Sequence, residues 1–288
     1  MKYDNQNFIA VFDSGIGGIS VLNELIARMP SENYIYFADA ANFPYGKKSK
    51  AELFDIGKGI ISQFDDKNAK ALVIACNTMS TCDMDGFKKT FPNLEIIGTF
   101  PSFTHIFKPG LVLSEQSISY DKENGINISR NKKKLLVLAT TSTCKSKFLN
   151  DLIKDCKGLI DIYVEASDFI ARAVENDEIN TFEFKRELSE LLKEYSDIDY
   201  LVLGCTHFPF AIDEIRAILG NDVHITSGSE ITVDNCYNYL SKNNLLTKNE
   251  SPYIRIIDVN LNESKINLYQ KLITLKNKSH EIEFSKTF

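Results

Sequence analysis

Two cysteines in the sequence stand where a predicted strand ends and a helix follows. Cys76 lies in Ala75–Thr78 and Cys205 in Gly204–His207, and in both segments hydroxyl, amide or imidazole side chains come next. The pKa of a thiol at a helix N-terminus is expected to be lowered, because that end of the helix stabilises a thiolate. A single cysteine at such a place is most often a small buried hydrophobe, but two in matched positions favour a chemical role.

Three kinds of chemistry could use these residues. Cys76, Cys205 and His207 could hold zinc, but Cys-x-His is not the usual ligand spacing and no Cys-x-x-Cys pair supports it. A cysteine–histidine nucleophile pair, as in thiol hydrolases, would leave the second thiol without a role. Two thiols on opposite sides of one carbon fit a third chemistry, in which one removes a proton and the other delivers a proton to the opposite face. The matched pair therefore favours stereochemical inversion.

A glycine-rich loop, Asp13–Gly18, follows the first predicted strand. Such a loop could present backbone N–H groups to a carboxylate or a phosphate. The dinucleotide pattern would need glycine at Ser20, and Asp13 would repel a pyrophosphate. A turn that serves packing alone is the other interpretation of the loop.

Short apolar runs that alternate with amphipathic stretches form the elements that must position these residues. Continuously apolar runs of this length predict strands buried on both faces of a parallel sheet, and the stretches between them are long enough for crossover helices. The pattern predicts an α/β fold. The predicted strands are 8–12, 34–38, 71–75, 95–98, 135–139, 160–164, 200–204 and 223–226, and the predicted helices are 19–28, 50–64, 82–91, 146–156, 181–195 and 210–219.

The polar stretch 114–134 separates the predicted strands into two groups and indicates a domain seam. Near the C-terminus, 253–259 is expected to form a late strand and 276–288 a solvated tail. Ligands of open α/β sheets bind at the carboxyl ends of the strands, so we expect the functional site there.

The composition excludes several classes of protein. The chain has 288 residues, 43% hydrophobic and 25% charged, which indicates a folded protein of one large or two modest domains. The net charge of −6 argues against general electrostatic binding of nucleic acid. No apolar run approaches the roughly 20 residues that span a bilayer, and no signal-peptide pattern is seen, so a cytoplasmic protein is expected. The six scattered cysteines are expected to be free thiols.

Taken together, the motifs resemble the cofactor-independent aspartate/glutamate racemase family, most closely its glutamate racemases. The resemblance covers roughly residues 8–231, and four motifs in order at strand ends are hard to obtain by chance. The segments that carry it are Phe12–Leu22, Tyr36–Gly46, Ala75–Thr78 and Leu203–Pro209, with weaker similarity at Ala139–Thr143, Glu175 and Ser227–Glu230.

The resemblance implies two doubly wound parallel-sheet domains with the active site in the cleft between them. One domain would comprise residues 1–102 and 208–288, and the other residues 103–207 with a polar insertion near 114–134. The implied activity is the interconversion of L- and D-glutamate without a cofactor or a metal, which supplies D-glutamate for peptidoglycan precursors. The expected binding partner is the amino-acid substrate. Binding to nucleic acid or to a membrane is not expected, and the chain could form a homodimer.

The resemblance also implies roles for individual residues. Cys76 and Cys205 would be the acid/base residues, the first deprotonating the D-isomer and the second the L-isomer. Asp13 and His207 would assist proton transfer or hold the substrate ammonium. The positions that match the substrate-binding residues of the family supply hydroxyl, amide and backbone donors rather than a basic cluster. Such donors can bind two carboxylates without an arginine. The positions that match the substrate-binding residues of the family are Asp13, Ser14, Tyr45, Gly46, Asn77, Thr78, Thr143, Thr206 and His207.

Departures from the family pattern bear on specificity. Asn42 stands where typical members have arginine, and Met79 replaces a usual small residue, so both could reshape the pocket. Glutamate is favoured over aspartate, because removing one methylene would misplace the distal carboxylate and leave buried donors unpaired. A racemase of another amino acid such as aspartate, and a non-catalytic relative that binds an amino acid, are the alternatives. Relatives with decarboxylase or isomerase activity often keep one of the two cysteines, whereas this chain has both.

Overall fold

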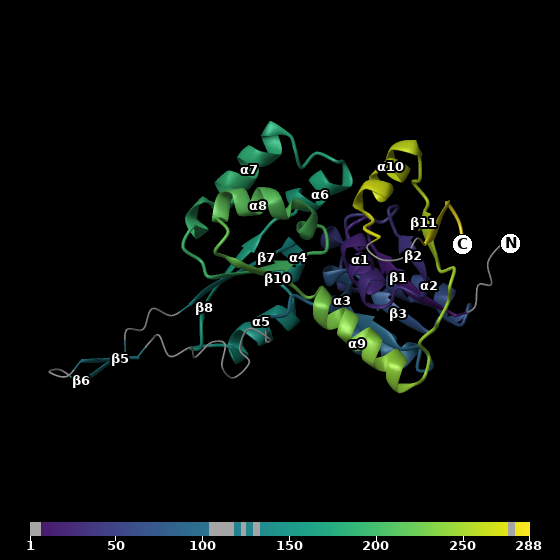
Figure 1. The fold of residues 1–288 in the computed structure, drawn as a ribbon, viewed down its shortest axis with the longest axis horizontal. Coiled ribbons are helices and arrows are strands. Elements are labelled where there is room, and N and C mark those ends of the chain that lie inside the picture. Colours follow the sequence, from purple (N-terminus) through teal and green to yellow (C-terminus); the bar gives the residue numbers. More distant parts are fainter. Residues whose placement is uncertain (1–6, 104–117, 122–124, 129–132, 276–279) are drawn as a thin grey trace.

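Two parallel sheets, one of six strands and one of four, form the framework of the chain (Figure 1). The computed structural model describes residues 7–103, 118–121, 125–128, 133–275 and 280–288. The sheets lie side by side, each with helices on both faces. The α/β class and the parallel sheets expected from the sequence are confirmed.

The six-stranded sheet has the order β12-β11-β2-β1-β3-β4, and all its pairs are parallel. Every residue of β1 is buried, because alternate side chains enter the cores on the two faces of the sheet. The strands are β1 (Phe8–Asp13), β2 (Asn33–Ala38), β3 (Ala71–Ile74), β4 (Ile96–Gly98), β11 (Tyr253–Asp258) and β12 (Glu281–Ser285).

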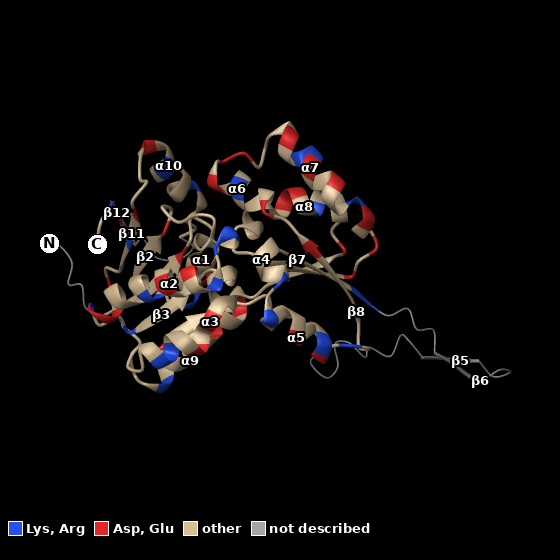
Figure 2. Ribbon diagram, turned by 180° about the vertical axis from the view of Figure 1, so that it is seen from behind, with Lys and Arg blue, Asp and Glu red and all other residues tan. Residues whose placement is uncertain are grey.

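Helices cover both faces of this sheet. They are α1 (Ile19–Arg28), α2 (Lys50–Asp65), α3 (Asn77–Thr90), α9 (Ser229–Lys242) and α10 (Glu263–Leu272). On one face α1, α9 and α10 bury residues such as Leu22, Val233 and Tyr269 against the strands. On the other face α2 and α3 bury Phe64 and Phe87. Acidic and basic residues are both scattered along the helices of the molecule (Figure 2).

The four-stranded sheet has the order β10-β9-β7-β8 and is also parallel. Its strands are β7 (Lys134–Ala139), β8 (Asp161–Ala166), β9 (Tyr200–Gly204) and β10 (His224–Ser227). Its helices are α4 (Thr141–Cys144), α5 (Lys147–Asp155), α6 (Phe169–Glu175), α7 (Phe182–Leu192) and α8 (Ile212–Leu219). Helices α6, α7 and α8 cover one face and α5 the other.

The domain boundaries remain a prediction, but one segment lies with a different sheet from the one that these boundaries imply. The predicted second domain ends at residue 207, whereas β10 pairs with β9 and places Thr226 opposite Val202. Helix α8 packs in the same core. The stretch 208–227 therefore lies with the four-stranded sheet, because a strand belongs to the sheet with which it forms its backbone hydrogen bonds.

The polar insertion contains a short antiparallel pair of strands. These are β5 (Ile118–Asp121) and β6 (Gly125–Ile128). The rest of the predicted insertion, apart from residues 133 and 134, lies outside the described residues.

Helix α3 and strand β8 differ from their predictions. Helix α3 begins at Asn77, five residues before the predicted start, and is interrupted by the non-helical backbone of Asp83. Strand β8 is apolar enough to be predicted as buried on both faces, yet it is the edge strand of its sheet and Tyr163 and Val164 are exposed. Position in the sheet, which depends on distant strands, decides burial here.

The predicted solvated tail, 276–288, is wrong for the part that the structure describes. Strand β12 pairs in parallel with β11 at the edge of the six-stranded sheet. The Phe288 ring stacks on Phe37 and meets Phe64 edge-on, with ring centroids 5.1 Å apart in both pairs. Because apolar and charged residues alternate in an edge strand, its composition resembles that of a solvated segment.

No helix within the described residues is long and apolar enough to cross a membrane. All six cysteines lie in the described part of the chain, and all six are free thiols.

We predict that Phe288→Ala lowers the free energy of unfolding by about 1–2 kcal/mol. The substitution removes apolar burial and ring contacts, but less of both than at a fully buried aromatic residue, because Phe288 is only half-buried. Urea denaturation would measure the change. Lys286→Ala, at an exposed position of the same segment, is the matched control and should change stability little. Equal midpoints for the two variants would show that the C-terminal residues do not pack on the sheet.

Candidate active site

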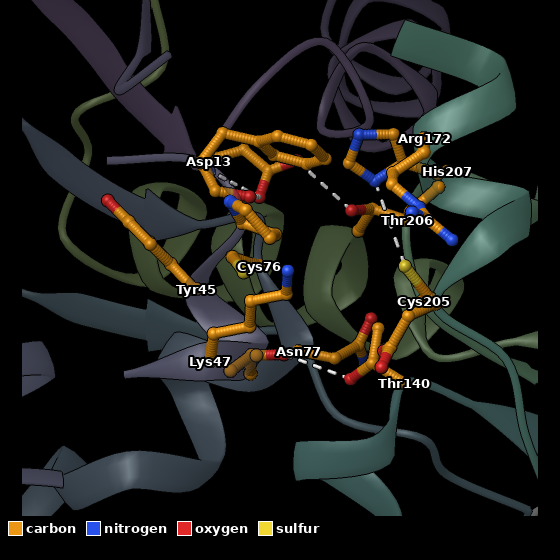
Figure 3. A pocket seen from close by; sticks show the side chains of 17 residues that line it. Asp13, Tyr45, Lys47, Cys76, Asn77, Thr140, Arg172, Cys205, Thr206 and His207 are labelled. Carbon is orange, nitrogen blue, oxygen red and sulfur yellow. Dashed lines mark hydrogen bonds between the residues drawn. The ribbon is translucent and has the colours of Figure 1, made fainter. Parts of the chain in front are cut away.

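A cavity of about 230 Å³ lies between the two sheets, at the carboxyl ends of their strands (Figure 3). Asp13 ends β1 and Cys76 follows β3, so both come from the six-stranded sheet. Thr140 follows β7 and Cys205 follows β9 in the four-stranded sheet. Both thiols therefore line one cavity and come from opposite sides of it.

The structure brings together nearly all of the residues that the sequence indicated. Thr143 is the exception: it is fully buried behind the cavity wall, where its Oγ1 is 3.0 Å from that of Thr140 and 3.4 Å from that of Thr78. It supports residues of the wall rather than lining the cavity. The predicted residues that do line it are Asp13, Ser14, Tyr45, Gly46, Cys76, Asn77, Thr78, Cys205, Thr206 and His207.

Cys76 is the N-cap residue of α3, as predicted, but its thiol is not activated in this structure. Burial, followed by the negative charge of Asp13, raises the pKa of Cys76 well above its usual range. The expectation of a lowered pKa is therefore wrong for Cys76, because the loss of solvation and a neighbouring carboxylate outweigh the helix end. The raised pKa favours the protonated thiol.

Asp13 is completely buried beside Cys76. Its carboxylate accepts hydrogen bonds from the backbone N–H of Ser14 at 2.7 Å and of Gly18 at 2.6 Å, and from Thr206 Oγ1 at 3.1 Å. Burial raises the pKa of Asp13, against the opposing effects of His207 and Cys76. A buried carboxyl group of raised pKa next to a thiol can exchange a proton with it.

Cys205 has a different partner. Its Sγ lies 3.7 Å from Nδ1 of His207, whose Nε2 donates a hydrogen bond to Oε1 of Glu175 at 2.8 Å. Burial alone would lower the pKa of His207, but its contacts with Cys205 and Glu175 raise that pKa well above its usual value. The imidazole is thus held in its charged form next to the second thiol.

Glu175 is a buried carboxylate that the sequence indicated only weakly. Its Oε1 also accepts the backbone N–H of Ile16 at 2.6 Å, and its Oε2 accepts Nζ of Lys265 at 2.5 Å. Burial opposes ionisation, but His207 and Lys265 outweigh it and lower the pKa of Glu175 to about 2. Glu175 therefore carries a negative charge that is balanced from both sides.

The glycine-rich loop binds the protein's own carboxylates. The N–H of Ile16 is used by Glu175 and that of Gly18 by Asp13, so neither is available to a ligand. A Cβ atom at Gly15 would overlap the carboxylate of Glu175, and one at Gly17 would overlap the ring of His207. The loop needs glycines at these two positions because side chains from the other half of the molecule occupy the space.

Two cations that sequence reasoning missed, Lys47 and Arg172, line the cavity. Lys47 extends into it from one side and Arg172 lies beside His207 on the other (Figure 3). Neither has an ion-pair partner within the described residues. The residues expected from the sequence included neither of them, because no local pattern marks these two among the other exposed cations of the chain.

Three residues lie differently from their expected places. The hydroxyl of Tyr45 donates to Asp39 Oδ2 at 2.7 Å and points away from the cavity centre (Figure 3). The amide of Asn42 donates to the same carboxylate, and Met79 is buried in the core under α3. Asn42 and Met79 are therefore not lining residues, in contrast to the expectation that they could reshape the pocket.

The zinc alternative concerns Cys76, Cys205 and His207. No cluster of three or more histidine, cysteine, aspartate or glutamate side chains in the part of the chain that the structure describes is arranged to hold a metal ion. Cys205 and His207 instead contact one another directly.

Comparison with known proteins gives consistent results. No protein-family model matches the chain. The chain is 33% identical over 268 residues to the glutamate racemase of Clostridium botulinum, covering 92% of this chain and 96% of that protein. The structure is similar to that of glutamate racemase from Francisella tularensis in complex with D-glutamate, with a TM-score of 0.76, 25% identity and coverage of 99% and 98%. The isoform RacE1 from Bacillus anthracis gives a TM-score of 0.74, 25% identity and coverage of 96% and 97%.

We predict that Gly17→Ala lowers the free energy of unfolding by about 1–3 kcal/mol, because the new methyl group must displace a buried imidazole held at both ends. Chemical denaturation measures the loss. The matched control is Gly59→Ala on the exposed side of α2, where a Cβ meets nothing within 4 Å and should stabilise the helix by up to about 1 kcal/mol. Similar effects of the two substitutions would contradict the packing of His207 against the loop.

Proposed function

The chain belongs to the glutamate racemase family, and we propose that it interconverts L- and D-glutamate by passing the Cα proton between two thiols. The observation that carries this proposal is the placement of Cys76 and Cys205 on opposite walls of one cavity, each beside a buried proton-transfer group. A substrate carbon between them would have a thiol on each face. Removal of the proton from one face and delivery to the other inverts the carbon.

In the direction from L to D, Cys205 as a thiolate takes the Cα proton and Cys76 donates its own proton to the opposite face. The buried thiol of Cys76, with its raised pKa, suits the role of donor in this direction. After the product leaves, Asp13 in its protonated form can return a proton to Cys76 and regain one from solvent. Cys205 releases the proton that it took to solvent, which leaves its thiolate beside the charged His207. In the direction from D to L the two thiols exchange roles.

The Cα proton of an amino acid is weakly acidic, so the site must stabilise developing negative charge. Ser14, Asn77 and Thr206 line the cavity and are buried, and hydrogen-bond donors that are fixed and shielded from water are most effective there. The small cavity between the two sheets holds the reacting groups close together. We propose that these groups suffice without a cofactor or a metal.

The cations of the cavity favour a dicarboxylate. Glutamate has one ammonium group and two carboxylates, and Asp13 offers the buried negative charge for the former. Lys47 and Arg172 offer positive charge for a carboxylate, in addition to the polar residues of the wall. The similar protein from Francisella tularensis holds D-glutamate. We therefore favour glutamate over aspartate and over neutral amino acids.

The cellular role follows from the product. We propose that D-glutamate made by this chain supplies peptidoglycan precursors in the cytoplasm, and that the roles of the site residues are those which the family resemblance implies. A homodimer is compatible with this function.

Cys76→Ala and Cys205→Ala are each expected to lower the rate of racemisation by a factor of about 10²–10⁴, the usual contribution of general acid–base catalysis. Circular dichroism of L- or D-glutamate incubated with each variant measures the rate. Cys144→Ala removes a thiol outside the cavity and should leave the rate nearly unchanged. A variant of either cavity thiol that retains the wild-type rate would rule out the two-thiol reaction, and binding without turnover by the wild-type protein would favour the non-catalytic alternative.

Arg172→Met is expected to raise KM for glutamate about tenfold. This factor corresponds to the weaker end of the range for a charge-assisted hydrogen bond, which we expect here because the Arg172 side chain is partly solvated. The loss should be larger for glutamate than for a neutral amino acid that lacks the distal charge. Arg186→Met, on the exposed side of α7, is the matched control. An unchanged KM for Arg172→Met would mean that this cation does not contact the substrate.

A further inference from the structure

We propose that Lys265, on the C-terminal helix α10, is a positioning residue for the His207–Cys205 side of the reaction and acts through Glu175. The proposal rests on the racemisation proposed above and adds a residue that does not line the cavity. Helix α10 packs on the six-stranded sheet, whereas Glu175 ends α6 beside the four-stranded sheet (Figure 1). Lys265 therefore connects the two halves of the molecule directly behind the candidate active site.

The two oxygens of the Glu175 carboxylate have different donors. Oε1 accepts the N–H of Ile16 at 2.6 Å and Nε2 of His207 at 2.8 Å, while Oε2 accepts Nζ of Lys265 at 2.5 Å. The terminal torsion of a glutamate is broad, so contacts at one oxygen alone leave the carboxylate plane weakly fixed. The donor on Oε2 fixes that plane and with it the acceptor for His207.

Lys265 is itself held in place. Its Nζ donates a second hydrogen bond, of 3.2 Å, to the backbone carbonyl of Glu175 at the end of α6. Helix α10 is capped by Asn262, whose Oδ1 accepts the N–H of Lys265 at 2.9 Å, and is anchored by Tyr269, whose hydroxyl donates to Asp258 at 2.9 Å. A lysine fixed at both ends can hold a partner at a defined place.

The ion pair is shielded from water. The side chains of Lys265 and Glu175 are 20% and 8% exposed, so solvent and salt screen their interaction little. Without Lys265, Oε2 of a buried carboxylate would lose the donor that the structure gives it, and the carboxylate would be free to turn toward water. His207 would then lose the fixed acceptor that aligns its Nδ1 with Cys205.

A purely structural role, docking α10 against α6, is the competing explanation. A second ion pair joins α10 to the turn just after α6, where Lys271 Nζ lies 2.6 Å from Asp177 Oδ1. Both of its side chains are about half exposed, and neither contacts Glu175 or His207. Lys271→Met therefore removes a docking contact without touching the proton-transfer groups and provides a matched control.

The first experiment compares kcat and KM for L-glutamate in the full-length protein. Lys265→Met is expected to lower kcat about tenfold with KM nearly unchanged, because Lys265 does not touch the substrate and controls only part of the acid–base contribution. Lys265→Arg should restore most of kcat, since it keeps a cationic donor, and Lys271→Met should leave kcat unchanged. A wild-type kcat for Lys265→Met, or an equal loss for Lys271→Met, would overturn the proposal.

The second experiment is a double-mutant cycle with Glu175→Gln. If Lys265 acts through Glu175, Lys265→Met should lower kcat little further in the Glu175→Gln background, whereas independent effects would multiply. Multiplied losses would overturn the proposal. Should Lys265→Met fail to fold, Lys265→Gln replaces it, with a kcat below that of Lys265→Arg expected and equal values contradicting the proposal. Absence of racemisation by the wild-type protein would instead defeat the proposed function itself.

Discussion

The arrangement of the active site depends on one buried charge, the carboxylate of Glu175. An ionised carboxylate that is shielded from water must find donors within the protein, and Glu175 takes them from Ile16, His207 and Lys265, which are far apart in the sequence. These contacts join the glycine-rich loop of the first sheet, the segment after β9 in the second sheet and the C-terminal helix. The position of His207 beside Cys205, and the need for glycine at Gly15, follow from the same contacts.

The two thiols occupy similar places but have chemically different partners. Cys76 lies beside a buried carboxyl group and holds its proton, whereas Cys205 lies beside a charged imidazole. A racemase that treats both isomers must have a proton on one thiol and none on the other before each turnover. The carboxyl group of Asp13 disfavours a thiolate at Cys76, whereas the positive charge of His207 favours a thiolate at Cys205. One thiol can therefore be protonated while the other is not. The different partners therefore match the starting state of the proposed L-to-D direction, in which Cys76 carries the proton and Cys205 does not.

Much of this site could be predicted from the sequence, because its residues follow strands that are continuously apolar and whose carboxyl ends meet at one edge. Cys76, Cys205 and the loop that begins at Asp13 lie at this edge for that reason. Lys265 could not be predicted, since its role depends on α10, a helix with a weak amphipathic pattern, reaching a carboxylate ninety residues earlier in the chain. Arg172 was missed for a related reason: α6 is too short to be recognised, and only the tertiary structure turns this side chain toward the cavity. Strand β12 likewise depends on a sheet edge formed by distant residues.

In the proposed reaction, the proton removed from Cα and the proton returned to it belong to different thiols. Racemisation of L-glutamate in deuterium oxide, followed by NMR before equilibrium is reached, tests this most directly. Newly formed D-glutamate is expected to carry deuterium at Cα while the remaining L-glutamate keeps its original proton, because Cys205 removes that proton and an exchanged Cys76 delivers the deuteron. D-glutamate that retains the original proton, or deuterium appearing equally in both isomers from the start, would contradict it.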